Sequence, residues 1–477
     1  MEATQHVQQA GAEEVDPHKA LKAVSAELGG LPLSDAALAT ELDRRDPLAA
    51  MRDRFLFPLA RADDPASGPA LYFCGNSLGL QPARARRYVL YELDEWHKRG
   101  VEGHFLHSPL TTADDDVAEG KKVEPWLTTD ENVHARAAGL VGALPLEVAI
   151  MNGLTVNLHL MMVPFYRPTA QRHKILIEGR SFPSDWYAVE TQIRFHGYEP
   201  STSLIQLYPR EGETTLRTED IIATIEKEGD SIALVLLSGV QYYTGQFFEI
   251  EKITAAGHSK GCVVGWDLAH AVGNVVLKLH EWGVDWACWC SYKYLNSGPG
   301  GIAGVFVHER HAHRKDLHRF GGWWGHTIKT RFDMNQPFDP EPGAFGFRLS
   351  NPPVLQCATL FASLEVFEEA GGMEKLRAKS VLLTAYLEML LLEKLAADIH
   401  IFTPREVAQR GCQLSVKFSV AVERVHEKLA QKGVIVDVRK PDVIRIAPAP
   451  LYNSFSDVLR FVTLLAQAIG ECKAESS

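Results

Sequence analysis

Between about residues 146 and 310, short apolar runs rich in β-branched residues alternate with amphipathic helical stretches. Apolar runs without polar alternation indicate strands buried on both faces, and helices between such strands are typical of a parallel sheet. Five runs fit this pattern: "HKILIEG" (173–179), "SIALVLLSGV" (231–240), "CVVGWDLA" (262–269), "WACWCSYK" (286–293) and "GIAGVFVH" (301–308). The region therefore predicts an α/β fold whose large, mostly parallel sheet is flanked by helices.

Polar residues occupy the ends of three of these predicted strands. Ser238, Asp267 and Lys293 each stand where an apolar run stops. In open parallel sheets, ligands bind outside the carboxyl ends of the strands, so the three side chains are expected along one rim. Lys293 follows Asp267 by 26 residues (293 − 267). This spacing predicts one intervening helix and a return to a neighbouring strand.

Lys293 has unusual neighbours for a lysine, because it lies in "CWCSYKYLNSGPGG" (288–301). Burial of an ammonium group in an apolar site costs free energy or lowers its pKa, so a chain that places lysine there commonly uses the amine. From this segment alone, a lysine whose ammonium group reaches the surface from a buried strand is an equally good interpretation.

Two further segments can complete a ligand site at the same rim. In "MNGLTVNLHL" (151–160), Gly153, Leu154 and Thr155 stand at a predicted helix start, where free backbone N–H groups and a hydroxyl suit a phosphate. In "FPSD", Phe182 offers an aromatic face at the end of another strand, followed by Pro183, Ser184 and Asp185.

A lysine amine, a carboxylate, an aromatic plate and a phosphate cup are the groups that pyridoxal phosphate (PLP) requires. The lysine forms the covalent link to the cofactor, and the carboxylate keeps the pyridine nitrogen protonated so that the ring can withdraw electrons. An aspartate at a strand end is by itself more often a cap. The combination, in this order along the chain, predicts a PLP enzyme.

Composition narrows the class of protein. The 477 residues are 46% hydrophobic, enough for a large core and more than one domain, and the net charge of −11 argues against nucleic-acid binding. The seven cysteines are scattered and form no C-x-x-C pair, as is typical of reduced thiols. No signal peptide and no membrane-spanning apolar run is recognisable, so we expect a soluble, cytoplasmic protein that binds no membrane.

The regions outside the sheet predict the domain organisation. Residues 1–16 are expected to be disordered, 17–69 to form helices beside a small domain, and 70–352 to form the large domain. Residues 353–477 are expected to form a smaller α+β domain, with long helices followed by strand, helix, two strands and a last helix. Ser454 and Asp457 predict a capping box at the start of that last helix. The acidic stretch 105–121 is expected to be a loop.

The sequence resembles the kynureninase family over nearly its whole length. The similarity runs from "YFCGNSLGLQP" (72–82) to "RIAPAPLYNSF" (445–455), and includes "SFPSDWYAVE", "LLSGVQYYTGQ", "GWDLAHAVGN", "CWCSYKYLNSGPGGIAG", "GWWGH" and "FRLSNPP". The resemblance implies the architecture of the aspartate aminotransferase superfamily (PLP fold type I). It also implies a homodimer whose active sites draw residues from both subunits.

The resemblance further assigns roles to individual positions. Lys293 matches the residue that binds PLP covalently and later carries a proton, and Asp267 matches the partner of the pyridinium nitrogen. The other matching cofactor contacts are Leu154, Thr155, Phe182, Pro183, Ser184, Asp185, Ser238, Tyr243, His270, Tyr292, Trp323 and Asn351. The matching substrate contacts are Arg445 for the α-carboxylate, His104, Ser350 and Asn351 for the aromatic ring, and Asn76 and Ser77 near the carboxylate.

The activity implied is hydrolysis of the Cβ–Cγ bond of L-kynurenine or 3-hydroxy-L-kynurenine to anthranilate or 3-hydroxyanthranilate and L-alanine. This step belongs to tryptophan catabolism and supplies NAD synthesis. Either Tyr243 or Tyr292 can serve as a proton carrier, and the sequence leaves that choice open. The stretch after His104 is longer than is usual in the family, so the preference between the two substrates also stays open.

Three other interpretations fit parts of the pattern. A cysteine desulfurase or an aminotransferase can share the fold, but a desulfurase needs a cysteine on a mobile loop, and none of the seven is so placed. A catalytically silent PLP-fold protein would not need Lys293, Asp267 and Arg445 together.

Two motifs favour structural roles. The histidines of "HERHAHRKDLH" (308–318) lack a carboxylate or cysteine at ligand spacing, so a polar surface stretch is predicted there, with no metal site. Cys288 and Cys290 alternate on a predicted strand and are interpreted as small buried thiols.

Overall fold

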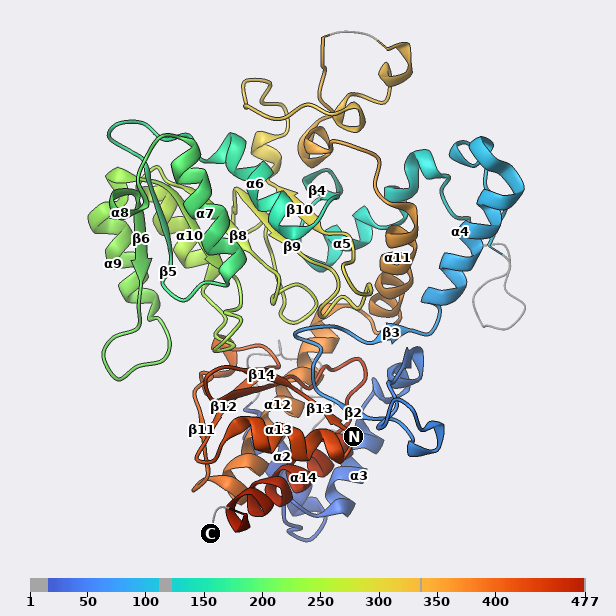
Figure 1. Cartoon of the computed structure of the whole chain (residues 1–477), viewed down its shortest axis with the longest axis vertical. Helices are drawn as coiled ribbons and strands as arrows, with labels where there is room; N and C mark the ends of the chain where they lie inside the picture. The colour runs from blue at the N-terminus through green and yellow to red at the C-terminus, as the bar shows by residue number, and fades with distance from the viewer. Residues whose placement is uncertain (1–15, 111–121, 335–336, 476–477) are drawn as a thin grey trace.

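A computed structural model describes residues 16–110, 122–334 and 337–475. The first fifteen residues of the predicted disordered start, and the part of the acidic stretch from 111 on, lie outside the described residues. Figure 1 shows a large α/β part above a smaller part that contains both the N-terminal helices and the C-terminal elements.

The large part is built on a seven-stranded sheet with the order β4-β10-β9-β8-β7-β5-β6. Every strand pairing is parallel except the two that β10 makes with β4 and β9. The strands are β4 (Val148–Ile150), β5 (Lys174–Glu178), β6 (Leu204–Leu207), β7 (Ile232–Ser238), β8 (Val263–Asp267), β9 (Trp286–Trp289) and β10 (Gly304–Val307). The five predicted strands are confirmed, and β4 and β6 were not predicted.

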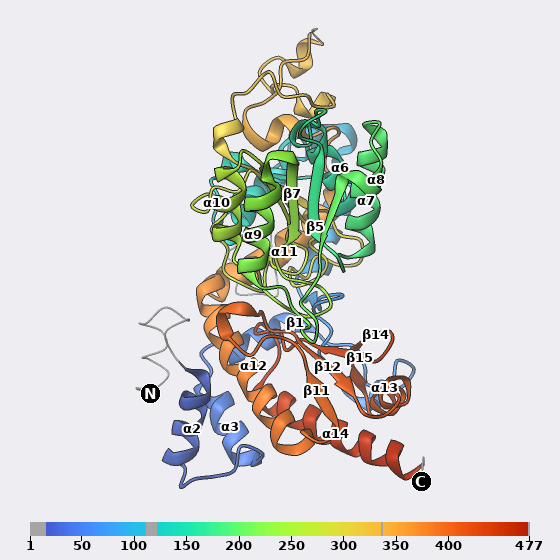
Figure 2. The same ribbon diagram turned by 90° about the vertical axis from the view of Figure 1, so that its left-hand side faces the viewer.

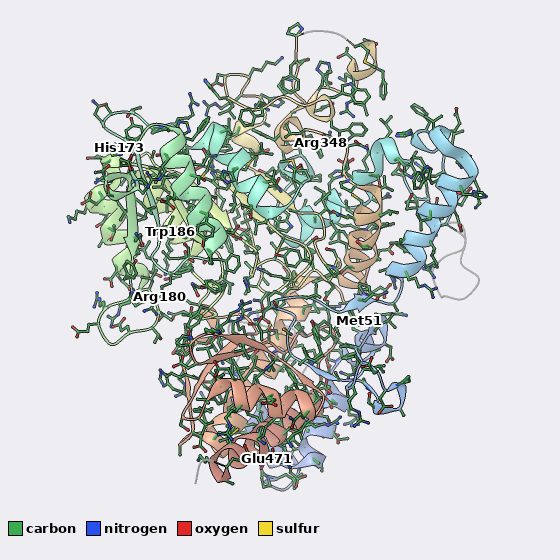
Figure 3. All side chains as sticks on the ribbon, viewed as in Figure 1. Met51, His173, Arg180, Trp186, Arg348 and Glu471 are labelled. Atoms are coloured by element: carbon green, nitrogen blue, oxygen red, sulfur yellow. The ribbon has the colours of Figure 1, made fainter. Side chains whose placement is uncertain are left out.

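Helices cover both faces of this sheet, as Figure 2 shows. On one face, α6 (Leu154–Phe165) and α7 (Pro183–Phe195) bury apolar side chains against alternate strand residues such as Ile175. On the other face, α9 (Thr218–Glu228) and α10 (Ile250–Ser259) share a core with the intervening residues such as Leu176. Short helices α5 (His134–Leu140) and α8 (Pro200–Ser203) complete the layers. Burial on both faces explains why the strands are apolar throughout.

The connection from β8 to β9 differs from the prediction. The expected helix between Asp267 and Lys293 is absent, and residues 268–285 form a series of turns. Leu268, Ala271, Val272, Val275, Leu277 and Leu279 are nevertheless buried in the sheet's core. The apolar residues here therefore anchor turns to the core, and spacing alone could not distinguish such turns from a helix.

The smaller part is a four-stranded antiparallel sheet with the order β11-β12-β15-β14. Its strands are β11 (Ile399–Ile401), β12 (Leu414–Phe418), β14 (Asp437–Arg439) and β15 (Val443–Ile446), and its helices are α12 (Met373–Leu395), α13 (Val422–Gln431) and α14 (Phe455–Ala474). The predicted capping box at Ser454 and Asp457 is present at the start of α14. Of the elements in this part, β11 was not predicted.

The N-terminal helices pack against this smaller part. Leu21 of α2 (Pro17–Glu27) and Leu38 of α3 (Ala36–Arg45) lie in one apolar cluster with Leu390 and Val458. The chain then returns through β2 (Leu71–Tyr72), which pairs in parallel with β13 (Val434–Ile435). Segments from the N-terminal and C-terminal regions therefore meet in this part. The exact domain boundaries stay a prediction.

Two long helices, α4 (Ala85–Arg99) and α11 (Val354–Glu369), pack together at one side of the large part, and the short strands β1 (Phe55–Leu56) and β3 (Gln81–Pro82) pair beneath them. Within the described ranges, no helix has both the length and the apolar character that crossing a bilayer requires.

Candidate active site

The carboxyl ends of the parallel strands face the smaller part (Figure 1). A cavity of about 270 Å³ is lined by residues at these strand ends. Its size is near the lower end of the range for small-molecule sites. The lining combines strand-end residues with the start of α6 and α7: Gly153, Leu154, Thr155, Val156, Glu178, Phe182, Ser184, Asp185, Ser238, Val240, Tyr242, Asp267, Ala269, His270, Tyr292, Lys293, Gly300 and Gly301. The predicted rim of polar side chains is therefore one cavity wall.

Lys293 lies on a turn four residues beyond the end of β9. Its Nζ is 3.0 Å from His270 Nε2, and lies 5.8 Å and 5.9 Å from the ring centres of Phe182 and Tyr292. Burial, and then the charge of Lys293, lower the pKa of His270 well below its ordinary value. The imidazole is therefore neutral and can accept a hydrogen bond from the lysine.

Glycines shape the turn that carries the lysine. Gly298 and Gly300 have φ values of 92° and 65°, a region that other residues rarely adopt. The backbone N–H of Gly79 donates to the Tyr292 carbonyl over 2.8 Å, and a Cβ at Gly79 would lie 2.3 Å from the Lys293 carbonyl oxygen. The "GNSLG" segment thus packs directly against the lysine turn.

Three buried carboxyl groups share the floor of the cavity. Burial, and then the neighbouring Asp267, raise the pKa of Asp185 well above its ordinary value. Burial also raises the pKa of Glu178 to about 7, with Asp267 adding to the rise and hydrogen bonds from Ser238 opposing it. Asp267 accepts a 2.7 Å hydrogen bond from the Ala269 backbone N–H. Such crowding of like charges is typical of functional sites.

The helix start predicted to bind phosphate lies on the cavity wall. Gly153 is the N-cap of α6, so the N–H groups of the following residues have no partner within the helix. A Cβ at Gly153 would meet no atom within 4 Å, so the space in front of the helix is open. Thr155 Oγ1 and Ser184 Oγ lie 2.5 Å apart, which joins the starts of α6 and α7.

Similarities to known proteins agree with this geometry. A family profile described as the kynureninase C-terminal domain matches residues 376–465. The chain is 55% identical over 429 residues to the kynureninase of Myxococcus xanthus, covering 90% of this chain and 96% of that protein. It is 52% identical over 462 residues to the kynureninase of Nematostella vectensis, covering 93% and 96%. The chain belongs to the kynureninase family.

More distant structures show how widely the fold is shared. A cysteine desulfurase of Escherichia coli aligns with a TM-score of 0.67 at 17% identity, over 89% of this chain and 99% of that one. A cysteine desulfurase of Thermococcus onnurineus aligns with a TM-score of 0.66 at 16% identity, over 90% and 99%. The predicted architecture, PLP fold type I, is confirmed.

Not every residue that matches the kynureninase pattern lines this cavity. Pro183 is the first residue of α7, beside the lining. Tyr243 stacks on Phe402, while its neighbour Tyr242 lines the cavity. Asn76 is fully buried and donates to Gln413 over 2.8 Å, and Ser77 is half-buried in the same turn.

Arg445 lies behind the cavity wall and is only 1% exposed. Its Nε and Nη2 donate to Asp437 Oδ1 over 3.0 and 2.9 Å, and its Nη1 donates to the Tyr242 carbonyl over 2.7 Å. Each nitrogen of the guanidinium group therefore contacts the chain itself, and one of these contacts is to Tyr242, a residue of the cavity lining.

Four other predicted residues lie away from the cavity. His104 ends a 3₁₀ turn (Gly100–His104) and packs edge-on against Trp126, with ring centres 5.4 Å apart. Trp323 is 48% exposed, and Ser350 and Asn351 are exposed as well. A single chain therefore brings together the residues around the lysine but leaves these four outside.

Two polar residues of the cavity lining were not predicted from the sequence. Glu178 closes an otherwise apolar strand, and a carboxylate at such a strand end was the signal that could have revealed it. Tyr242 is adjacent to Tyr243, the tyrosine that was predicted. Which of two neighbouring tyrosines in a loop faces a cavity depends on the backbone conformation, which the sequence does not show.

The histidines of residues 308–318 are not all surface groups, so the prediction of a polar surface stretch was wrong for two of them. His308 lies 3.6 Å from the buried Glu147, and His311 lies 3.0 Å from the buried Asp285. Their side chains are only 12% and 11% exposed. The carboxylates come from distant parts of the chain, so local spacing could not reveal them.

One of these groups, Glu147 with His280 and His308, places possible metal-ligating atoms within 4.8 Å of one another. The Glu147 oxygens already accept hydrogen bonds from His280 and from two backbone N–H groups. The prediction of no metal site therefore stays a prediction.

Cys288 and Cys290 are buried and unpaired, as expected, and no cysteine lines the cavity within the described part of the chain.

Proposed function

We propose that this chain is a PLP-dependent kynureninase. It hydrolyses the Cβ–Cγ bond of L-kynurenine to anthranilate and L-alanine, and that of 3-hydroxy-L-kynurenine to 3-hydroxyanthranilate and L-alanine. The observation that carries the proposal is the placement of the Lys293 amine in a cavity with buried carboxyl groups on one side and an open helix start on another. Relatives that bear the kynureninase name at 47–55% identity support it.

The cavity fits PLP on a test of its unpaired polar atoms. Asp185 Oδ1 and His270 Nδ1 are buried and have no hydrogen-bond partner among the described residues. A buried polar atom without a partner costs free energy, and both of these atoms belong to residues that line the cavity. A bound ligand with polar groups can therefore supply their missing partners. The open space before Gly153 suits the phosphate.

The roles follow from where each residue lies. Lys293 would hold PLP covalently, Asp267 would face the pyridinium nitrogen, and Phe182 would stack on the ring. The N–H groups after Gly153, with Thr155, Ser184 and Ser238, would bind polar groups of the cofactor. Bound there, PLP supplies an electron sink for charge that develops at the substrate's Cα.

The chain's own groups manage the protons. Neutral His270 accepts a hydrogen bond from Lys293 Nζ, which holds the end of the lysine side chain in the cavity. Burial raises the pKa of Tyr292, so its hydroxyl stays protonated and can donate. We propose Tyr292 as the proton carrier in preference to Tyr243, because Tyr292 lines the cavity.

The α-carboxylate of the substrate would bind Arg445. A planar guanidinium fork suits a planar carboxylate, but here Asp437 already occupies two of its nitrogens. Substrate binding therefore requires Asp437 to share or yield these hydrogen bonds. Asn76, whose Oδ1 is buried without a partner, and Ser77 stand on the same side, in the turn that packs against the lysine.

The remaining predicted residues fit a homodimer with shared sites. Trp323 lies in a loop with several exposed apolar side chains, among them Phe332 and Met334, which are 46% and 71% exposed in a single chain. Exposed apolar groups of this kind mark interaction surfaces. A second copy that covers them would bring Trp323, Ser350 and Asn351 to the partner's cavity.

Mixing a Lys293 variant with a Trp323 variant tests this sharing. Lys293→Ala removes the amine from one chain, and Trp323→Ala removes the indole from the other. If each site takes Trp323 from the partner, random mixing leaves one intact site in each heterodimer and restores about a quarter of wild-type activity. If both residues act within one chain, the mixture has only the activity of its Trp323→Ala sites.

His104 bears on the choice between substrates. If it donates a hydrogen bond to the ring hydroxyl, 3-hydroxykynurenine should have the higher kcat/KM, because a site built to bind a hydroxyl discriminates strongly against its absence. Equal values for the two substrates, unchanged by His104→Ala, would contradict this role.

The first experiment is an absorbance spectrum of the purified protein with added PLP, followed by addition of 3-hydroxykynurenine. We expect a visible band from bound PLP, then fluorescent hydroxyanthranilate and alanine in equal amounts. A band without product would favour another reaction on this fold. A cysteine desulfurase is already disfavoured, because all the cysteines but the half-buried Cys74 are buried. By its chemistry, the enzyme would act in cytoplasmic tryptophan catabolism and supply NAD synthesis.

A further inference from the structure

Glu178 has no role among the expected cofactor or substrate contacts, yet it lines the cavity. It is the last residue of β5, is 3% exposed, and faces Ser238 at the end of the neighbouring strand β7. One carboxyl oxygen, Oε2, accepts the Ser238 backbone N–H over 3.0 Å. The other, Oε1, is in a short hydrogen bond with Ser238 Oγ. The carboxyl group therefore grips the backbone and the hydroxyl of one residue.

We propose that Glu178 is a positioning residue that sets whether the Ser238 hydroxyl accepts or donates a hydrogen bond inside the cavity. The inference rests on the proposed function, because Ser238 is taken there as a PLP contact. A serine hydroxyl has one hydrogen and two lone pairs, so the direction of its bond to Glu178 decides what it offers to a ligand.

The two states differ by one proton on Glu178 Oε1. When Glu178 is ionised, the Ser238 O–H donates to Oε1, and only the lone pairs of Ser238 face the cavity. When solvent supplies a proton to Oε1, the acid O–H donates to Ser238 Oγ, and the serine hydrogen turns into the cavity. The Ser238 backbone N–H donates to Oε2 in both states, so the geometry is preserved while the hydroxyl reverses.

The surroundings of Glu178 place this proton exchange near neutral pH. Burial raises its pKa to about 7, the hydrogen bonds from Ser238 oppose the rise, and Asp267 on β8 adds to it. Asp185 on α7 faces the same space, and its own pKa is raised in part by Glu178. Tyr242 also lines the cavity, and Lys293 is the cation among these groups. PLP binding can therefore depend on pH through this carboxyl group.

The experiment uses the wild-type holoenzyme, Glu178→Gln and Ser238→Ala, and measures the dissociation constant and visible absorbance of bound PLP across about three pH units around 7. In the glutamine variant the amide oxygen accepts the Ser238 backbone N–H, so the amide nitrogen donates to Ser238 Oγ at every pH. Glu147→Gln is the matched control, because Glu147 is equally buried but lies outside the cavity.

In the wild type, we expect the plot of the PLP dissociation constant against pH to have an inflection near pH 7. The constant should change about three- to tenfold, which is the change expected from gaining or losing one hydrogen bond. The inflection should disappear in Glu178→Gln, shrink clearly in Ser238→Ala and persist in Glu147→Gln. Persistence in Glu178→Gln, or full amplitude in Ser238→Ala, would overturn the proposal. If Glu178→Gln does not fold, Ser238→Ala still decides, because it keeps the backbone bond to Glu178. If no variant and no wild type binds PLP, the proposed function itself fails.

Discussion

Buried carboxyl groups at the two ends of the central sheet differ in their hydrogen-bond partners and in the direction in which their pKa is shifted. At the amino end, Asp285 accepts hydrogen bonds from His258, His311, Arg310 and the Val264 backbone N–H. These bonds and the charge of Arg310 outweigh burial and hold the pKa of Asp285 well below its ordinary value. At the carboxyl end, Asp185 keeps one buried oxygen without a partner, and its pKa is raised.

The difference separates carboxylates that stabilise the fold from those prepared for a ligand. A structural carboxylate receives its donors from the chain, because a buried charge without partners costs several kcal/mol. A carboxylate prepared for a ligand accepts that cost in the protein without ligand, and the ligand later removes it. Of the two carboxylates, only Asp185, at the end of the sheet that holds Lys293, keeps a buried oxygen without a partner, and this difference does not depend on any family resemblance.

The largest effect should come from replacing Lys293, and Lys174, at the opposite end of the sheet, provides the control. Lys293→Ala should lower kcat by about 10⁴-fold or more and abolish the borohydride-trapped PLP adduct, because no other amine lines the cavity in the described structure. Lys174→Ala, at the start of β5, should leave both unchanged, because Lys174 only pairs with Glu228 over 3.0 Å. A trapped adduct in the Lys293 variant would contradict the assignment.

Two buried arginines extend the same contrast to the smaller part. Arg445→Lys should raise KM for kynurenine about 10- to 100-fold with a smaller change in kcat, because lysine cannot replace two charge-assisted hydrogen bonds. Arg410 is equally buried and binds Glu388 over 2.7 Å, away from the cavity. Arg410→Lys should lower stability and leave KM unchanged. A KM effect of equal size in both variants would show general loosening of the smaller part.

The fold was largely predictable because its strands are buried on both faces. Continuous apolar runs such as "SIALVLLSGV" identified β7 and its neighbours. By contrast, β4 has only three residues, and β6, "LIQL", is interrupted by a glutamine and buries only its last residue. The turns of residues 268–285 were mistaken for a helix, because the prediction used only the 26-residue separation of Asp267 and Lys293 (293 − 267), which a series of turns fills equally well. Tertiary burial, not local propensity, decides such segments.

The site was predictable where strand ends carry polar residues. Ser238, Asp267 and Lys293 meet in the cavity because parallel strands end at one edge. The contact of Arg445 with the Tyr242 carbonyl depends on how the loop after β7 meets the smaller part, which spacing does not encode. The pairing of Arg445 with Asp437 depends on the register of β15 against β14. The positions of Trp323 and Asn351 depend on a second chain in our proposal, so no single sequence pattern could place them.

The next prediction concerns stability at the amino end of the sheet. Asp285→Asn should lower the free energy of unfolding at neutral pH by about 3 kcal/mol, because it removes one partner from a buried ionic network. The folded pKa of Asp285 lies below its ordinary 3.8, so its contribution is present above that pH and is lost as pH falls further. The difference between wild type and variant in urea unfolding should therefore narrow below about pH 4.

Asp185→Asn should change stability least, and it should stabilise the apoprotein where Asp285→Asn destabilises it. The folded pKa of Asp185 is raised, so the native apoprotein binds its proton more tightly than the unfolded chain does, and wild-type stability falls as pH rises above 3.8. An amide has no charge to bury. The free energy of unfolding of the variant apoprotein should therefore exceed that of the wild type by about 1 kcal/mol at pH 8, with no difference at pH 4. Its affinity for PLP should fall, because the amide no longer offers a carboxyl oxygen. Lower apoprotein stability at both pH values would show that Asp185 belongs with Asp285, as a carboxylate that supports the fold.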